Sequence, residues 1–415
     1  MDSKSVRNAT VCVIGLGYVG FPLAEAFSRH VKTIGFDINT EKIQSIVNST
    51  PSFFATDNPA EIKKADYLMI CVPTPVTMTK QADLSFVCAA AELVGQNLKP
   101  GATVVLESTV YPGVTEEIVK PILEKESGLK CGNGFRIGYS PERINPGDME
   151  NVLPTITKIV AGMDDETLAD LVELYGMITN VYKSKNIQTA EAAKVIENIQ
   201  RDLNIALMNE LAIIFHHLNL DTKDVLDAAG SKWNFLRFSP GLVGGHCIPV
   251  DPYYLVARAQ EFDYHPQVIL AGRAINDSMP RYVAMMAIEG INSVGKVIKG
   301  SNVLIMGLTY KENIPDIRES PSVEIIHELK RFGVSVYGFD PFLSDDIIDK
   351  FGILNFKNCI CKIDAIIITV AHDQFQKMRI DQFKEYMNEH PLLIDVRRII
   401  KREDAEKNGI YYKGL

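Results

Sequence analysis

A glycine-rich hexapeptide, GLGYVG at residues 15–20, directly follows the short apolar run TVCVI at residues 10–14. A helical pattern comes next, and then a second apolar run that ends at Asp37, seventeen residues after Gly20. Strand, glycine turn, helix and acid-ended strand form one βαβ unit, in which glycines permit a tight turn and close approach of a pyrophosphate. An acid at this place accepts hydrogen bonds from an adenosine ribose and repels a 2′-phosphate. The pattern predicts an NAD site, with a glycine turn that binds no ligand as the alternative.

Further apolar runs at residues 67–72 and 103–106 extend this predicted parallel sheet, which covers roughly the first 180 residues. Open α/β sheets bind their ligands at the carboxyl ends of the strands. The polar or turn-forming residues that directly follow these two runs are Pro73, Thr74, Ser108 and Thr109. For Ser108 and Thr109, a role as plain turn residues is an equally good explanation on local evidence.

Apolar residues recur at intervals of three and four between residues 187 and 220, which predicts a helix of about thirty residues and roughly 50 Å. A helix of that length usually bridges domains or supports a dimer interface. Beyond it the first pattern returns, because an apolar run at 303–308 leads into a glycine turn and Gly-Phe-Asp at 338–340 echoes Gly-Phe-Asp at 35–37. The repeat lacks the full glycine motif, so it should bind something other than a second NAD.

A chain of 415 residues is too long for one comfortable core, so several domains are expected. The predicted fold class is α/β, with two Rossmann-like, doubly wound parallel-sheet domains joined by a long central helix and a helical dimerisation domain.

Composition excludes several other classes of protein. The net charge is −9 with basic residues spread along the chain, which argues against nucleic acid as the main partner. No apolar stretch approaches the roughly 20 residues that span a bilayer, and the first ten residues are polar. The seven cysteines form no CxxC pair, so reduced thiols in the cytoplasm are expected. Cys359 and Cys361 are too close together to indicate a zinc site, and no metal is expected.

Cys247 differs from the other cysteines in its surroundings. Cys12, Cys71 and Cys88 lie in apolar runs, where a small buried side chain is the natural interpretation. Cys247 instead lies in GGHCIPVD at residues 244–251. A thiolate can add to an aldehyde, and the resulting thiohemiacetal can lose a second hydride. Together with the NAD motif, Cys247 predicts an oxidoreductase that holds its substrate covalently.

Several polar residues are candidates for proton transfer. Glu142, in SPER at 140–143, could act as a base for water, although a surface salt bridge with Arg143 would normally be favoured. Lys194 and Asn198 are four residues apart and share one face of the long helix, where such pairs are usually solvated. Asp251, four residues after Cys247, could pair with a cation or activate water.

Two loops carry candidate ligand-binding residues. Lys232 and Arg237 precede Cys247 in a loop that also contains aromatic residues such as Phe235, a mixture that suits a phosphate-bearing ligand. Lys311 and Arg318 lie in the first turn of the repeat and could contact a diphosphate, with a merely charged loop as the alternative.

The chain resembles the nucleotide-sugar 6-dehydrogenases over nearly its whole length, from GLGYVG at 15–20 to DVR at 395–397. The most specific segment is GLVGGHCIPVD at 241–251. The segments ESTVYPG at 107–113 and SPERINPG at 140–147, together with KWNF at 232–235, are most similar to the branch that oxidises UDP-GlcNAc or UDP-GalNAc.

The resemblance implies three domains: an NAD-binding Rossmann domain at 1–186, a central helical dimerisation and substrate domain at 187–295, and a UDP-sugar-binding Rossmann-like domain at 296–415.

The resemblance also implies roles for individual residues. Cys247 matches the nucleophile, whereas Lys194, Asn198 and Asp251 match groups that stabilise oxyanions and handle protons. The residues implied to order or activate water are Thr109 and Glu142. The residues implied to bind the cofactor are Gly15, Gly17, Tyr18, Val19, Gly20, Asp37, Lys42, Pro73, Thr74, Ser108 and Arg318. Those implied to bind the substrate are Lys232, Phe235, Arg237, Gly244, Lys311 and, more weakly, Arg397. Several relatives carry a second carboxylate where this chain has Pro146.

The predicted function is NAD-dependent, four-electron oxidation of the 6-hydroxyl of UDP-GlcNAc or UDP-GalNAc to a uronate, by a cytoplasmic homodimer or larger homo-oligomer that serves polysaccharide or glycan synthesis. UDP-glucose or UDP-ManNAc is the alternative substrate. Two other classes stay open. A two-electron dehydrogenase of the 3-hydroxyacid type would need neither Cys247 nor the third part, and a non-catalytic NAD-responsive protein should have lost Lys194 or Cys247.

Overall fold

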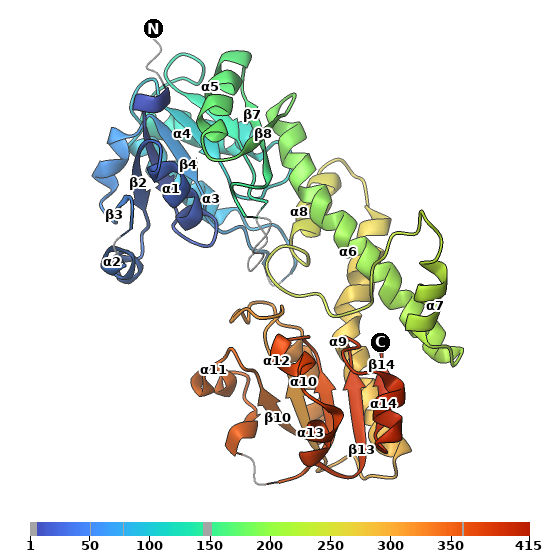
Figure 1. Cartoon of the computed structure of the whole chain (residues 1–415). Helices are drawn as coiled ribbons and strands as arrows, with labels where there is room; N and C mark the ends of the chain where they lie inside the picture. The colour runs from blue at the N-terminus through green and yellow to red at the C-terminus, as the bar shows by residue number, and fades with distance from the viewer. Residues whose placement is uncertain (1–5, 50, 78, 144–151, 359–360) are drawn as a thin grey trace. The chain divides into compact units, whose positions relative to one another are not determined.

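The computed structural model describes residues 6–49, 51–77, 79–143, 152–358 and 361–415 (Figure 1). The chain divides into two compact units. Unit 1 comprises Met1–Asn198 and Val250–His265, and unit 2 comprises Ile199–Pro249 and Pro266–Leu415. Within the described residues, no helix has both the length and the apolar character needed to cross a membrane.

Unit 1 is built on an eight-stranded sheet in the order β3-β2-β1-β4-β5-β6-β7-β8. Its strands are β1 Thr10–Ile14, β2 Lys32–Phe36, β3 Phe54–Thr56, β4 Tyr67–Ile70, β5 Thr103–Leu106, β6 Arg136–Tyr139, β7 Thr157–Gly162 and β8 Asn180–Lys183. All neighbours pair in parallel except β6 and β7, which are antiparallel. The predicted parallel sheet is therefore confirmed, with one antiparallel pair that the sequence pattern did not indicate.

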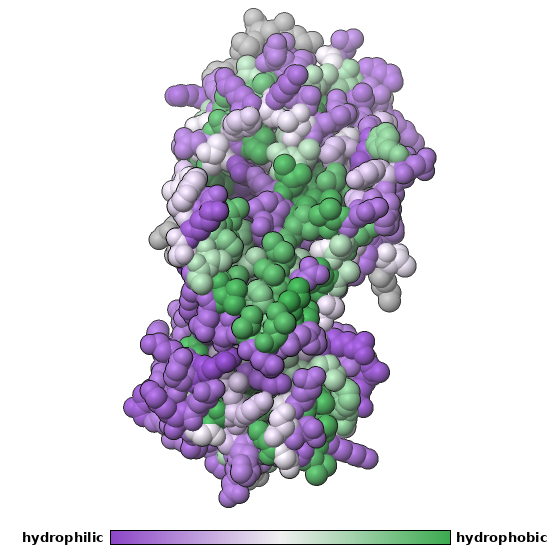
Figure 2. Space-filling view, turned by 90° about the vertical axis from the view of Figure 1, so that its right-hand side faces the viewer, coloured by the Kyte–Doolittle hydropathy of each residue, from purple (hydrophilic) through white to green (hydrophobic). Residues whose placement is uncertain are grey.

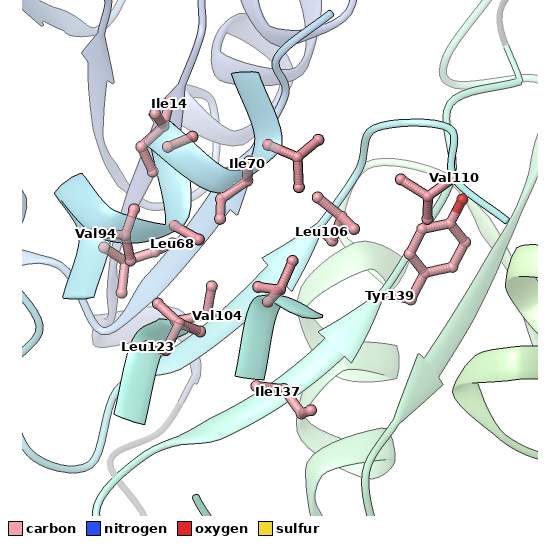
Figure 3. Packing of buried hydrophobic residues seen from close by; sticks show 14 of the residues in the cluster. Ile14, Leu68, Ile70, Val94, Val104, Leu106, Val110, Leu123, Ile137 and Tyr139 are labelled. Carbon is pink, nitrogen blue, oxygen red and sulfur yellow. The ribbon is translucent and has the colours of Figure 1, made fainter. Parts of the chain in front are cut away.

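Alternate residues of the central strands supply two cores, one on each face of this sheet. In β1, Cys12 and Ile14 belong to one buried cluster, whereas Val11 and Val13 belong to the other. Figure 3 shows the first cluster, where Ile14, Leu68 and Leu106 pack beneath helix side chains. Successive side chains of a strand point to opposite faces, so a strand covered on both faces is apolar throughout.

Two of the helices of unit 1 have side-chain caps at their N-termini. The helices of this unit are α1 Gly20–Ser28, α2 Thr40–Asn48, α3 Ser85–Gln96, α4 Lys120–Ser127, α5 Asp165–Gly176 and α8 Asp251–Gln260, with a π turn at Thr115–Val119. Asn39 caps α2 by accepting from the Lys42 N–H, and Asp164 caps α5 by accepting from the Thr167 N–H. The long helix α6, Ile187–His217, has 31 residues, close to the predicted length.

Unit 2 contains a six-stranded, wholly parallel sheet in the order β11-β10-β9-β12-β13-β14. Its strands are β9 Asn302–Met306, β10 Ser335–Phe339, β11 Leu354–Asn355, β12 Ile363–Ile368, β13 Met387–Asp395 and β14 Tyr411–Gly414. Its helices are α7 Thr222–Ala229, α9 Gln267–Ser293, α10 Ser322–Arg331, α11 Asp345–Asp349, α12 Asp373–Gln376, α13 Ile380–Glu385 and α14 Arg402–Lys407.

The two sheets repeat one design. The order β11-β10-β9-β12-β13 in unit 2 corresponds to β3-β2-β1-β4-β5 in unit 1. The glycine after the first strand has a positive φ in both, +92° at Gly15 and +98° at Gly307, a conformation that favours glycine. The repeat expected from Gly-Phe-Asp at 35–37 and 338–340 is thus present in the fold.

Five of the described cysteines form no disulfide bond: Cys12, Cys71, Cys88, Cys131 and Cys247. Cys361 is disulfide-bonded, so the expectation of reduced thiols is wrong at that residue.

Candidate active site

The glycine turn after β1 has the shape that a dinucleotide requires. A Cβ atom at Gly15 would lie 2.7 Å from the Cys71 carbonyl oxygen, and one at Gly20 would lie 1.9 Å from the Gly15 carbonyl oxygen. At Gly17, by contrast, a Cβ would meet no protein atom within 4 Å. Gly15 and Gly20 are therefore required by the fold, whereas Gly17 leaves open space at the turn, where a pyrophosphate would approach the backbone.

Asp37 lies at the end of β2 beside this turn. Its Oδ2 accepts from the Leu16 N–H at 2.9 Å and from the Lys42 Nζ at 2.7 Å. Burial alone would raise the pKa of Asp37, but the hydrogen bonds from Lys42 and from backbone N–H groups outweigh it and lower the pKa. An ionised carboxylate in this place suits a ribose diol and disfavours a 2′-phosphate, so the residues fit NAD.

The neighbouring strand ends bring further predicted residues to the same edge of the sheet. Ser108 is buried after β5, and its hydroxyl donates to the Val72 carbonyl oxygen at 2.7 Å. Thr109 and Thr74 are half-buried, whereas Pro73 and Tyr18 are exposed. The hydrogen bond from Ser108 joins the segments that follow β4 and β5.

Lys194, Asn198 and Asp251 form a buried cluster in unit 1. Asn198 and Lys194 lie on α6, and Asp251 is the first residue of α8. The Asn198 Nδ2 donates to the Asp251 Oδ2 at 2.5 Å. Burial raises the pKa of Asp251 to about 6, against the lowering effects of the Lys194 charge and the Asn198 hydrogen bond. The pair on α6 is not a solvated surface pair, and Asp251 can exchange a proton near neutral pH.

Glu142 is buried just beyond β6, and its Oε1 accepts from the Arg143 N–H at 2.6 Å. The Arg143 guanidinium pairs instead with Glu197 of α6 at 2.6 Å. The salt bridge between Glu142 and Arg143 that local spacing favoured is therefore wrong, because α6 offers Arg143 another carboxylate. Pro146 lies outside the described residues.

Behind Glu142 lies an ion pair that the sequence analysis missed. The Lys158 Nζ, on β7, lies 2.7 Å from the Glu107 Oε2, and both side chains are fully buried. Lys158 also donates to the carbonyl oxygens of Ser140 and Pro141, while the Tyr175 hydroxyl donates to Glu107. A lysine within an otherwise apolar strand was the one available signal. The network fixes the backbone that leads into Glu142.

Glu191 was also missed, although it ties α6 to the segment after β5. Its carboxylate accepts from the N–H groups of Gly113 and Thr115, at 2.6 and 2.9 Å, and from the Thr115 hydroxyl at 2.7 Å. Burial nevertheless raises the pKa of Glu191 to about 7. This link holds the helix that carries Lys194 against the loop that carries Thr109.

In unit 2, the loop that carries Cys247 is held by its glycines and by Asn209. The Asn209 side chain donates to the Gly241 carbonyl oxygen at 3.0 Å and accepts from the Gly241 N–H at 2.8 Å. A Cβ at Gly244 would lie 2.7 Å from the Glu319 carbonyl oxygen, and one at Gly245 would lie 2.5 Å from the Tyr310 ring. No larger residue fits against the segment 310–321, so the loop is fixed there.

Cys247 itself is exposed, unlike the cysteines of the β-strands. Burial raises the pKa of Cys12 to about 12 and raises that of Cys71 well above its usual range. Cys88, expected to be buried, is half-buried. Among the described cysteines without a disulfide, Cys247 is thus the one classed as exposed, and the nucleophile needs such access.

The remaining predicted substrate residues also lie in unit 2. Arg318 pairs with Asp316, and Arg397 pairs with Glu312 at 2.7 Å. The Arg237 guanidinium donates to the Gly230 carbonyl oxygen, and Lys232 is exposed beside half-buried Phe235. Lys311 is half-buried on the segment that packs against the Cys247 loop. Cys247 and Lys311 therefore belong to one unit, and Lys194, Asn198 and Asp251 to the other.

Comparison with known proteins gives a consistent result along the chain. Models of the UDP-glucose/GDP-mannose dehydrogenase family match in three places: the NAD binding domain at residues 47–179, the central domain at 188–278 and the UDP binding domain at 304–402.

Individual relatives match over almost their whole length. Protein CapL of Staphylococcus aureus is 44% identical over 96% of this chain and 97% of its own. UDP-N-acetyl-D-glucosamine 6-dehydrogenase of Salmonella typhi is 43% identical over 97% of this chain and 99% of its own. The solved UDP-D-ManNAc dehydrogenase of Pyrococcus horikoshii superimposes with a TM-score of 0.86 at 28% identity, covering 98% of this chain and 99% of its own.

Proposed function

The chain belongs to the UDP-glucose/GDP-mannose dehydrogenase family and is an NAD-dependent oxidoreductase, and we propose that it converts the 6-hydroxyl of UDP-GlcNAc or UDP-GalNAc into a carboxylate. The choice of sugar is supported by 43% identity to a UDP-N-acetyl-D-glucosamine 6-dehydrogenase, against 28% to a UDP-D-ManNAc dehydrogenase. UDP-glucose and UDP-ManNAc are the alternative substrates.

The observation that carries the chemistry is the accessible Cys247 in a loop fixed by its glycines, four residues before buried Asp251. Two NAD molecules, held in succession at the Gly15–Gly20 turn and by Asp37, would supply the hydride acceptors for the two oxidations at C6. In the first oxidation the 6-hydroxyl loses its proton and C6 loses a hydride, which leaves an aldehyde. The Cys247 thiolate then adds to the aldehyde carbon, and the thiohemiacetal loses a proton and a second hydride to become a thioester. Water breaks the C–S bond, which releases the uronate and regenerates the thiol.

The buried polar residues serve the proton transfers of this sequence. Asp251, with a pKa of about 6, accepts protons at neutral pH and passes them to solvent. Lys194 and Asn198 stabilise the oxyanions that form at C6. Glu142, held in place by Lys158 through the Ser140 and Pro141 carbonyls, activates water with Thr109.

Substrate recognition belongs to unit 2. Lys311 and Arg318 contact the diphosphate, with weaker support for Arg397, while Lys232, Phe235, Arg237 and Gly244 bind the rest of the sugar nucleotide. The match of residues 304–402 to a UDP binding domain supports the assignment of Lys311, Arg318 and Arg397. For the three domains we propose the bounds 1–186, 187–295 and 296–415.

We further propose a homodimer or larger homo-oligomer in the cytoplasm, formed through α6. Ile196, Leu207 and Ile214 are exposed and fall on one face of this helix. Hydrophobic residues also reach the surface on the face drawn in Figure 2. Light scattering on the purified chain measures the assembly, and a monomeric mass would refute it.

The stoichiometry of NADH tests the function. Purified protein is mixed with NAD and one of UDP-GlcNAc, UDP-GalNAc, UDP-ManNAc or UDP-glucose, and NADH is compared with uronate. The expected result is about two NADH per uronate, fastest with UDP-GlcNAc or UDP-GalNAc. One NADH per product would favour a two-electron dehydrogenase, and no turnover would favour a binding protein. Cys247→Ala should stop uronate formation, whereas the matched control Cys88→Ala, another free and incompletely buried thiol, should not.

A further inference from the structure

The two sheets carry the same acid at the same place, but its surroundings differ. Asp37 follows β2 and accepts from the Leu16 N–H, and Asp340 follows β10 and accepts from the equivalent Leu308 N–H at 2.7 Å. Asp37 keeps 8% of its surface exposed, whereas Asp340 has none. In unit 1 the carboxylate can still accept hydrogen bonds from a ribose, but in unit 2 it is fully buried.

Asp340 has four donors within the protein. Its Oδ2 accepts from the N–H groups of Leu308 and Thr309 and from the His372 Nε2, at 2.7, 3.1 and 3.1 Å, and its Oδ1 accepts from the Phe342 N–H at 2.9 Å. The hydrogen bond from His372 outweighs burial, together with the backbone donors, and lowers the pKa of Asp340. A carboxylate so enclosed acts on its neighbours in the fold rather than on a ligand.

The contacts of His372 determine its tautomer. The Nδ1 lies 2.9 Å from the Asn313 backbone N–H, which can only donate, so Nδ1 carries no proton. The proton is therefore on Nε2, which donates to Asp340. The ring is fully buried, with centroids 5.0 Å from Phe342 and 5.2 Å from Phe375. His372 thus connects the segment after β12 to Asp340, which follows β10, and to Asn313.

Hydrogen bonds to Asp340 and to His372 are made on the two sides of Lys311 along the chain. Asp340 holds the Thr309 N–H at one end, and His372 holds the Asn313 N–H at the other. Between them the Thr309 hydroxyl donates to the Lys311 carbonyl oxygen at 3.0 Å. Asn313 has a φ of +59°, and its side chain exchanges two hydrogen bonds of 3.0 Å with Asp373. The backbone on both sides of Lys311 is fixed from the ends of β10 and β12.

We propose that His372 is a positioning residue that, with Asp340, holds residues 309–313 so that Lys311 is presented to the diphosphate of the sugar nucleotide. This inference rests on the proposed function, in which Lys311 binds the diphosphate. The two equivalent acids then have different roles: Asp37 binds a ribose, whereas Asp340 holds the segment that carries Lys311.

Two variants test separately the hydrogen bond of His372 to Asn313 and its hydrogen bond to Asp340. In His372→Asn the amide oxygen replaces Nδ1 and can accept from the Asn313 N–H, whereas in His372→Gln the amide nitrogen replaces Nε2 and the Asn313 N–H loses its acceptor. Both variants lose the ring packing against Phe342 and Phe375, so they are matched for that loss. The probe is UDP, titrated calorimetrically into the full chain, with NAD binding as the control for unit 1.

We expect His372→Gln to raise the Kd for UDP about tenfold, because the Asn313 N–H loses the hydrogen bond that holds this end of the segment in place. KM for the sugar nucleotide should rise with it, while kcat and the Kd for NAD stay unchanged. His372→Asn should stay within about twofold of the unchanged protein. Equal Kd values for UDP in the wild type and His372→Gln, or equal losses in the two variants, would refute the inference.

Lys311→Met distinguishes this failure from failure of the proposed function. If Lys311→Met weakens UDP binding and His372→Gln does not, Lys311 binds the diphosphate without help from His372, and the inference alone is wrong. If Lys311→Met leaves the Kd for UDP unchanged, the role of Lys311 in the proposed function is wrong, and the positioning role falls with it.

Discussion

Lys158→Met tests whether the buried ion pair behind Glu142 stabilises unit 1. Methionine keeps the length of the side chain but removes the charge, so Glu107 retains only the hydrogen bond from Tyr175. Both partners of the pair have an exposed fraction of zero, and their charged atoms lie 2.7 Å apart. Removing one partner of such a pair leaves a buried charge without compensation, which costs about 3–5 kcal/mol. For a unit of about 200 residues this lowers Tm by roughly 6–20 °C.

The loss should depend on pH, because Glu107 can avoid the penalty by taking up a proton. Burial already raises the pKa of Glu107 in the presence of Lys158, and removing the lysine raises it further. A carboxyl whose pKa is higher in the folded than in the unfolded state loses stability as pH rises above about 4.3. The variant should therefore lie closest to the wild type near pH 5 and furthest from it near pH 8.

Scanning calorimetry with and without NAD measures this effect, because the transition that NAD shifts belongs to unit 1. The matched control is Lys99→Met, which breaks an ion pair of the same 2.7 Å length with Asp66, but with side chains 31% and 21% exposed. That change should cost only about 0–1 kcal/mol. Adding Glu107→Gln to Lys158→Met should restore most of the lost stability. Equal losses in the two lysine variants, or a loss independent of pH, would contradict the argument.

Three further predictions concern the site itself. Asp37→Asn should lower the ratio of kcat/KM for NAD to kcat/KM for NADP by at least about tenfold, because the carboxylate that repels a 2′-phosphate is gone. An unchanged ratio would refute the role of Asp37. Single-turnover oxidation should rise with pH through an apparent pKa of about 6, since Asp251 must be ionised to accept a proton, and a flat profile from pH 5 to 8 would exclude it. Iodoacetamide should label Cys247 before Cys12 and Cys71, as read by peptide mass, and the sugar nucleotide should protect it.

The strands and long helices could be predicted from sequence because their patterns are local. Thr103–Leu106 was placed to the residue, and α6 differs from its predicted end by only a few residues. The acid-ended strands stop one residue early, at Phe36 and Phe339, and the carboxylates that follow accept from the Leu16 and Leu308 N–H groups of the glycine turns. Periodicity describes which face is buried, but it does not describe what an acid at the strand end will contact.

The ion pairs of the site could not be predicted in the same way, because they join residues far apart in the sequence. Lys158 lies 51 positions from Glu107, and Arg143 lies 54 from Glu197. Local spacing favoured Arg143 with Glu142, but in the fold Arg143 pairs with Glu197 of α6. Which charged residues pair depends on how the strands and helices are arranged in the fold. Sequence motifs therefore identified the candidate reacting groups but not the ion pairs that hold them in place.

The repeat shows how one fold can keep its backbone and change its ligand. Gly15 and Gly307 keep the same positive φ, but the place of Gly17, which leaves open space, is taken by Thr309. The Thr309 hydroxyl fills that turn, donating to the Lys311 carbonyl oxygen and lying 3.2 Å from the His372 Nε2. The NAD fit of the first turn depends on the open space at Gly17 and on a carboxylate that a ribose can reach. The second turn has neither, because Thr309 fills the space and Asp340 is fully buried. The second sheet is thereby free to present Lys311 to a different phosphate-bearing ligand.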